Sequence, residues 1–242
     1  FNNAPIASLP SPGLTISPAT SVNEGDYYLV VSNAFGVARS DTAHLFVTGD
    51  CSGPAAFKVC DELSLRQAIA KGGLIQFCCN GTITLTSPLE ITKDVGLDAR
   101  NQLVVLDGAD KVRLVHVHPG VKFAATNVTF TRGYHEGSPG VDGEGIGGLP
   151  GALPVPGGDG EGGAIYNEMG DVTLVGCQLV KNRVLGGLGP VDNYGGPVRA
   201  EAHPGKGSGG AILNHGGSLI VMDSSFRGNA ARDGESRPVA FG

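Results

Sequence analysis

The segment from position 93 to position 113 carries charged side chains of the types that cleave acidic polysaccharides. Its acids and bases are Asp94, Asp98, Asp107, Asp110, Lys93, Arg100, Lys111 and Arg113. Carboxylates that hold Ca²⁺ beside an Arg or Lys base suit a lyase, and a carboxylate pair across a cleft suits a glycosidase. Asp98, Asp107 and Arg113 are the catalytic candidates only if the chain is such an enzyme. We favour the other interpretation, that the acids are turn residues, because Asp is common at corners and Gly108 follows Asp107.

Two histidines, His116 and His118, alternate along one predicted strand and so face the same side of it. Two imidazoles bind a transition metal when further ligands join them. The sequence identifies no third ligand in register, so we interpret the pair as an exposed polar face and expect no metal site and no cofactor. Weakly bound Ca²⁺ is the one alternative, at acids in glycine-rich segments that lack the known calcium-binding nonapeptide period. These acids are Asp142, Glu144, Asp159 and Glu161.

The five cysteines are too few for a disulfide scaffold. Cys51 and Cys60 flank a short Gly-Pro stretch, and in an oxidising compartment we expect a disulfide between them. Adjacent Cys78 and Cys79 do not form a CxxC zinc element. Cys177 lies on the inward side of a predicted strand, where we expect a buried, inert thiol.

The elements that position these residues are indicated by an internal repeat. Gly162 to Asn167 reads GGAIYN and Gly209 to Asn214 reads GGAILN, and a shift of 47 residues superimposes the two copies. Each copy leads to a further asparagine, Asn182 in the first and Asn229 in the second. A repeat of this kind predicts units that stack to bury a shared core. We expect the two asparagines to form an amide ladder at one corner of the stack.

From Leu74 onward the predicted strands are only three to five residues long, with Gly, Asn or Asp between them. Such corners suit left-handed backbone conformations, and the pattern favours a chain that coils through three faces per turn. We therefore predict an all-β fold, a parallel β-helix. A rung needs roughly 20 to 25 residues, so each 47-residue period holds either a rung and a glycine-rich excursion or two rungs, one of them irregular. An apolar column is expected inside, made by Phe130, Leu179 and Phe226.

Two motifs precede the strands. Ser64 to Gln67 has the form of a capping box, and the helix that it starts should end at Gly72 and cover the first rung. Residues 24–36 resemble the last strands of an immunoglobulin-like domain, with Tyr27 at the corner tyrosine and Leu29 in place of the second cysteine. Only half of such a domain is matched, so either the chain is a fragment or a partner supplies the rest.

The strand and repeat motifs together are similar to the right-handed parallel β-helix group, which includes pectate-lyase-like proteins and bacterial polymorphic outer-membrane or autotransporter-type adhesins. The motifs are Gly72-Gly73-x-Ile75, Gly81-Thr82-Ile83-x-Leu85, the two GGAI units and Phe226-Arg227-Gly228-Asn229. The resemblance covers about residues 56 to 242, and the first copy departs from it with Leu179 in place of Phe. It implies a bacterial protein that is secreted or displayed on the cell surface.

The predicted organisation has three regions. Residues 1–48 form the C-terminal half of an immunoglobulin-like domain, and residues 49–73 form a linker and an N-terminal capping helix. Residues 74–242 form the β-helix, with excursions at 134–162 and 185–209. Because no initiator Met precedes Phe1 and no cap is evident beyond Phe226, we expect a fragment or a stacking subunit.

Charge and hydropathy narrow the function. A net charge of −6 and a pI near 5.4 give no basic face for nucleic acid, and no apolar run of about 18 residues predicts a membrane-spanning helix. We expect a non-enzymatic extracellular structural or adhesive protein. It would self-associate, as a filament subunit using its incomplete ends, or bind a cell-surface or polysaccharide target. The alternative is a β-helix polysaccharide lyase or glycoside hydrolase.

Overall fold

The computed structural model describes residues 16–17, 25–45, 51, 54–100, 102–142, 154–190 and 203–236. The chain divides into two compact units, residues 1–56 and residues 57–242. Glu144 and the middle parts of both predicted excursions lie outside the described residues.

The first unit contains two short antiparallel strand pairs. β1 (Gly25–Tyr27) pairs with β4 (Ala43–Leu45), and β2 (Val30–Asn33) pairs with β3 (Gly36–Arg39). The Asn33 Oδ1 atom accepts hydrogen bonds from the backbone N–H groups of Phe35 (2.8 Å) and Gly36 (3.1 Å), which closes the hairpin between β2 and β3. The side chain at the tip, Phe35, is 99% exposed. The described strands do not make the two packed sheets of an immunoglobulin-like domain.

The second unit is built mainly from three sheets whose strands, from β6 onward, pair in parallel. Sheet 1 contains β5 (Ala56–Phe57), β6 (Gly73–Phe77), β9 (Val95–Asp98), β12 (Lys122–Thr126), β17 (Asp171–Val175) and β22 (Ser218–Met222). Sheet 2 contains β7 (Gly81–Thr84), β10 (Val104–Asp107), β13 (Val128–Thr131), β18 (Gln178–Val180) and β23 (Ser225–Arg227). Sheet 3 contains β8 (Leu89–Ile91), β11 (Val115–Val117), β16 (Ile165–Glu168) and β21 (Ile212–His215).

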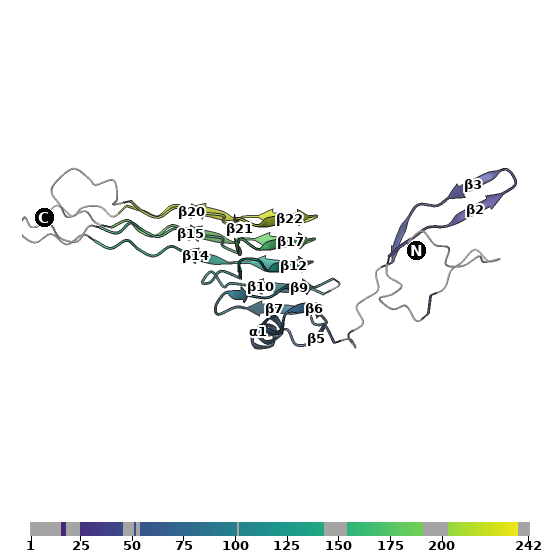
Figure 1. The fold of residues 1–242 in the computed structure, drawn as a ribbon, viewed down its shortest axis with the longest axis horizontal. Helices are drawn as coiled ribbons and strands as arrows, with labels where there is room; N and C mark the ends of the chain where they lie inside the picture. Colours follow the sequence, from purple (N-terminus) through teal and green to yellow (C-terminus); the bar gives the residue numbers. More distant parts are fainter. Residues whose placement is uncertain are drawn as a thin grey trace, which may run out of the picture. The chain divides into compact units, whose positions relative to one another are not determined.

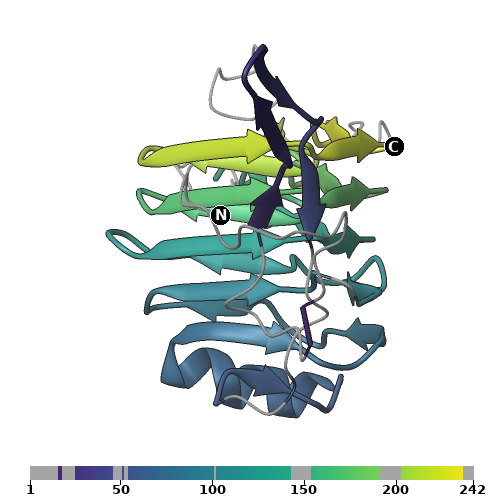
Figure 2. The same cartoon turned by 90° about the vertical axis from the view of Figure 1, so that its right-hand side faces the viewer.

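The chain visits these sheets in a constant order. From β6 it passes through sheets 1, 2 and 3, returns to sheet 1 and begins again, so that successive passes lie one above another (Figures 1 and 2). This parallel, layered arrangement is compatible with a β-helix. In the upper passes, paired residues of neighbouring strands are separated by one 47-residue repeat, since Ile165 pairs with Ile212 and Leu179 with Phe226. Each copy of the repeat is therefore one rung.

The corners between sheets 1 and 2 show why short strands alternate with Gly, Asn and Asp. Asn127, Gly176 and Asp223 directly follow paired strands of sheet 1 and have φ angles of 57°, 63° and 48°. This left-handed conformation is strained for most residues and least costly for Gly, Asn and Asp. The same turn is thus repeated at the same place in successive rungs.

One helix, α1 (Glu62–Lys71), contacts β6 and β8 and buries Leu65 and Ile69. It ends at Gly72, as predicted, but it begins earlier than the capping box at Ser64 indicates. The N-cap is Asp61, whose side chain accepts a hydrogen bond from the Ser64 backbone N–H at 2.8 Å. An extended Asp three residues before Ser64 provides the stronger N-cap, so the prediction of the helix start was wrong.

The glycine-rich tracts leave the sheets after sheet 2 and return before sheet 3. Their outgoing strands β14 (Tyr134–Glu136), β19 (Arg183–Leu185) and β24 (Ala230–Arg232) pair in parallel, as do the returning strands β15 (Gly160–Glu161) and β20 (Gly207–Ser208) (Figure 1). Beyond these strands the backbones stay hydrogen-bonded to one another. The N–H of Gly187 donates to the Gly158 carbonyl (2.8 Å), and that of Gly205 donates to the Gly187 carbonyl (2.9 Å).

The described parts of these tracts therefore form a glycine arm, residues 133–141, 154–163, 183–190, 203–211 and 230–236, in which backbone packs on backbone. A Cβ atom added at Gly187 would overlap the Ser138 carbonyl, and one added at Gly205 would overlap the Gly158 carbonyl. Glycine is required here because neighbouring chains occupy the space of a side chain. The excursions are thus stacked on each other rather than independent loops.

The disulfide pattern corrects one prediction. Cys60 is bonded to Cys79, with their Cα atoms 5.8 Å apart, and the proposed pairing of Cys60 with Cys51 was wrong. Cys60 follows β5 and Cys79 follows β6, and these strands are neighbours in sheet 1, so the fold brings the two residues together. Cys51 and Cys78 are also disulfide-bonded, and Cys177 is a buried free thiol.

Candidate functional site

The most distinctive surface of the second unit is its open end, the outer edges of β21, β22, β23 and β24. Each of these strands is the last in its sheet, and no described strand pairs with its outer edge. Side chains that are buried one rung earlier are exposed here. Val221 is 37% exposed where Leu174 is 0%, and Phe226 is 50% exposed where Leu179 is 0%.

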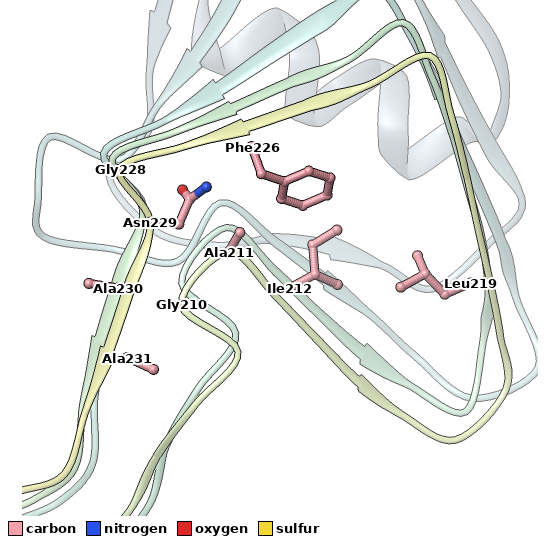
Figure 3. Close-up of a pocket in the computed structure, with 9 residues that line it drawn as sticks. All are labelled: Gly210, Ala211, Ile212, Leu219, Phe226, Gly228, Asn229, Ala230 and Ala231. Carbon is pink, nitrogen blue, oxygen red and sulfur yellow. The ribbon is translucent and has the colours of Figure 1, made fainter.

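A shallow hollow of about 500 Å³ lies at this end. Figure 3 shows Ile212, Leu219 and Phe226 directed into the space that the rung encloses, with Ala211 and Asn229 beside them. Its floor is therefore the apolar interior of the stack, laid open. A neighbouring rung of the same type would fill it.

An amide ladder runs to this surface. The Asn182 side chain is fully buried, and its Nδ2 donates to the Phe130 carbonyl (3.1 Å) and to the Asn229 Oδ1 (3.0 Å). Its Oδ1 accepts from the Gly133 N–H at 2.8 Å. Asn229 repeats the pattern by donating to the Leu179 carbonyl at 2.8 Å. The structure thus brings the two predicted ladder residues together.

The apolar column also lies in register, since Phe130 pairs with Leu179 and Leu179 with Phe226. Sequence reasoning missed a second ladder at the start of each repeat. The Asn167 Nδ2 donates to the Asn214 Oδ1 at 2.5 Å and to the Gly170 carbonyl at 2.9 Å. Both asparagines belong to the aligned repeat, so the 47-residue offset was the signal that could have found them.

The three candidate catalytic residues have separate partners. Asp98 ends β9 in sheet 1 and forms an ion pair with Arg100 (2.8 Å). Asp107 ends β10 in sheet 2 and forms a bidentate pair with Arg132. Arg113 donates from Nε to the Gly162 carbonyl at 3.0 Å. The structure describes no interaction that joins Asp98, Asp107 and Arg113 in one site.

The surroundings of these groups favour fixed charges over proton transfer. Burial would raise the pKa of Asp107, but the Arg132 hydrogen bonds and charge, with the Ala109 N–H, hold that pKa below its usual range. Burial lowers the pKa of Arg113, which Glu161 partly offsets. Asp107 is therefore an ionised, neutralised carboxylate, which is the state of a structural corner residue.

One histidine is strongly perturbed. Burial, with the charge of Arg113, lowers the pKa of His135 to about 4. Its Nδ1 accepts a hydrogen bond from the Glu161 N–H at 2.9 Å. A neutral imidazole thus joins the outgoing and returning strands of the glycine arm.

His116 and His118 lie on the outer face of sheet 3, as an exposed polar face would require, but they are not alone. A carboxylate oxygen of Glu90 lies 3.0 Å from His116 Nδ1 and 2.7 Å from His118 Nε2. Glu90, His116 and His118 each offer one ligand atom, and the three atoms lie close enough together to hold a metal ion. Glu90 pairs with His116 across β8 and β11. Glu90 could not be identified as the third member of this group from the sequence, because the sequence does not show the register of strands whose paired residues are 26 positions apart.

Comparison with known proteins gives no match to a family model, to a curated protein or to a solved structure. Within the described residues, no helix is both long and apolar enough to cross a membrane.

Proposed function

We propose that the chain is a non-enzymatic structural or adhesive protein of the bacterial cell exterior, built on a right-handed parallel β-helix and completed at its open end by a second copy. The observation that carries the proposal is the exposure of Val221 and Phe226, whose counterparts in the preceding rung are fully buried. Fully burying an apolar side chain of this size contributes roughly 1.5–3 kcal/mol, and covering the exposed part of Val221 and Phe226 recovers a share of it. The partial immunoglobulin-like domain remains part of this proposal.

The unpaired strand edges support strand addition as the mode of contact. Sheet edges offer N–H and C=O groups that another chain can pair with. The opposite end is unsuitable for such stacking, because α1 covers the first rung and buries Leu65 and Ile69. Two copies would therefore meet open end to open end, with the same surface contributed by each.

A filament would need a second contact. The hairpin β2–β3 is the candidate, since its side chains are exposed from Val30 to Arg39. Exposed glycine-arm residues and the polar outer faces of the sheets are the surfaces for a cell-surface or polysaccharide target. The Cys60–Cys79 disulfide supports secretion, because such bonds persist in oxidising compartments.

The lyase or glycosidase alternative receives less support. Such an enzyme needs carboxylates free to bind Ca²⁺ or to exchange protons. Asp98 and Asp107 are each neutralised by an arginine, and they end strands of different sheets.

The test is the association state of the whole chain by sedimentation velocity over a range of concentrations. We expect a dimer for the wild type and a monomer for Phe226→Lys, which places a charge in the open end. Leu103→Lys is the matched control, because Leu103 is exposed away from this end and should leave the dimer intact. Electron micrographs would show whether dimers join further into fibres.

A wild-type chain that stays monomeric at every concentration would overturn self-association through the open end. So would a dimer that Phe226→Lys leaves unchanged while Leu103→Lys disrupts it. Circular dichroism on both variants separates loss of association from loss of folding.

A further inference from the structure

The outer face of sheet 3 brings together side chains from three adjacent strands. Glu90 is the central residue of β8 and His116 that of β11, and each lies between two buried residues of its strand. His118 directly follows β11, and Glu168 ends the next strand, β16. Because the strands pair in register, these side chains project from a rigid surface to the same side.

The contacts within this group present an unusual balance of donors and acceptors. His116 has a Glu90 oxygen 3.0 Å from Nδ1 and a Glu168 oxygen 3.1 Å from Nε2. An ionised carboxylate only accepts hydrogen bonds, and a neutral imidazole has one N–H. A neutral His116 therefore leaves one lone pair facing a carboxylate. A cation bound between them, either a proton or a metal ion, removes this repulsion.

We propose that Glu90, His116 and His118 bind a divalent transition-metal ion of the zinc type. The ligand atoms are one Glu90 oxygen, His116 Nδ1 and His118 Nε2, which already lie within 4.8 Å of one another. Ligands about 2.0–2.1 Å from a tetrahedral zinc ion are roughly 3.3 Å apart. The Glu90 oxygen is 3.0 Å from one nitrogen and 2.7 Å from the other, so these two separations must widen by about 0.3 and 0.6 Å to admit the metal.

Glu168 completes the arrangement as the outer partner of a ligand. When His116 Nδ1 binds the metal, its Nε2 carries the proton and donates to Glu168 at the observed 3.1 Å. Metal-binding histidines commonly donate their second N–H to a carboxylate, which fixes the ring and makes it a better ligand. The stacked His116 and His118 rings, with centroids 4.2 Å apart, restrict each other further.

The ligand chemistry selects the class of metal. Two imidazoles and one carboxylate suit Zn²⁺ and its first-row neighbours, whereas Ca²⁺ and Mg²⁺ prefer oxygen ligands. Tyr166 and His215 border the site but are engaged with each other, since the Tyr166 hydroxyl lies 3.1 Å from His215 Nδ1. This leaves three protein ligands and an open position on the exposed side.

The test is calorimetric titration of the folded chain with Zn²⁺ and, separately, with Ca²⁺ and Mg²⁺. We expect one Zn²⁺ per chain, with Ca²⁺ and Mg²⁺ binding far more weakly. His118→Ala should remove saturable binding, and Glu168→Gln should weaken it by about 10- to 100-fold, the usual effect of losing an outer-shell partner. Titration with Co²⁺ supplies a second readout, the absorption bands of a tetrahedral site.

His203→Ala is the matched control, because His203 is an exposed histidine of the glycine arm whose Nδ1 contacts the Pro204 carbonyl. It should bind Zn²⁺ like the wild type. Zn²⁺ binding that survives both His116→Ala and His118→Ala in chains folded by circular dichroism would overturn the proposal. Absence of saturable Zn²⁺ binding by the wild type would overturn it too, and would leave a proton as the bridging cation.

Discussion

The two copies of the repeat share the GGAI motif, two asparagines and the same strands, yet they differ sharply in burial. In the first copy Asn167, Leu174, Leu179 and Asn182 are all completely buried. In the second copy Asn214, Val221 and Phe226 are exposed and Asn229 is half-buried. The difference arises because the first copy has a rung on each side, whereas the second has a described neighbour on one side only.

This difference indicates that the stabilisation contributed by a residue depends more on whether rungs cover it on both sides than on which amino acid it is. The stability of a repeat protein is approximately the sum of the intrinsic stabilities of its repeats and the contacts between neighbouring repeats. Equivalent substitutions in the two copies should therefore have unequal effects in the monomeric state. Two pairs of equivalent substitutions and one histidine that belongs to a single rung test this expectation.

The largest effect is expected at the amide ladder. Asn182→Ala leaves the buried Gly133 N–H and Phe130 carbonyl without their partner, and each such loss costs about 1–3 kcal/mol. We expect the free energy of unfolding to fall by about 3–4 kcal/mol. Asn229→Ala should cost only about 1 kcal/mol, because water at the open end can replace the amide as partner of Asn182 and of the Leu179 carbonyl. Urea denaturation of both variants measures the two values, and equal losses would contradict the comparison.

The apolar column should show a similar but smaller contrast. Leu179→Ala opens a cavity between two rungs and should cost about 3 kcal/mol. Phe226→Ala removes a larger side chain but should cost only about 1–2 kcal/mol, because half of that side chain is already in water. Thermal unfolding at a concentration where the chain is monomeric distinguishes them. In a dimer closed at the open end, the Phe226→Ala cost should approach that of Leu179→Ala.

The smallest effect is the change in the free energy of unfolding as the pH is lowered. His135 has a pKa lowered to about 4 in the folded protein, against about 6.5 in an unfolded chain. The unfolded chain therefore binds the proton first, and stability is complete above pH 6.5 and declines as the pH falls toward 4. We expect a loss of about 1–2 kcal/mol, reduced by partial exposure.

His135→Asn should flatten this part of the pH–stability curve, since the amide can still accept from the Glu161 N–H but does not titrate. The positions in register in the next rungs are Val184 and Ala231, so the effect belongs to a single rung. His203→Asn is the control and should leave the curve unchanged. An identical curve for wild type and His135→Asn would contradict the role of His135.

Several of these features could be predicted from the sequence, because aligning the two copies of a repeat shows which residues occupy equivalent positions in neighbouring rungs. Once the two GGAI units are aligned, Asn182 falls above Asn229 and Leu179 above Phe226 without any knowledge of the backbone. The covering helix was predictable from Leu65 and Ile69 on one side and Gly72 at its end. Its start was not, because Asp61 and Ser64 are both good caps and only the backbone decides between them.

Long-range register explains the failures. Cys60 meets Cys79, and Glu90 meets His116, only because particular strands are adjacent, and no repeat marks those offsets in the lower rungs. The partner of Asp107 was likewise missed, because Arg132 lies 25 residues away on the next rung.

The glycine arm has a consequence for how such a chain can change over generations. Most of its glycines face the backbone of a neighbouring tract, so inserting one residue into a single tract would move side chains into positions that admit none. Changes in length should therefore be inherited in step, with a matching insertion in every tract that lies alongside. The two excursions should therefore change length together. A natural variant that lengthens only one of them should do so outside the glycine arm.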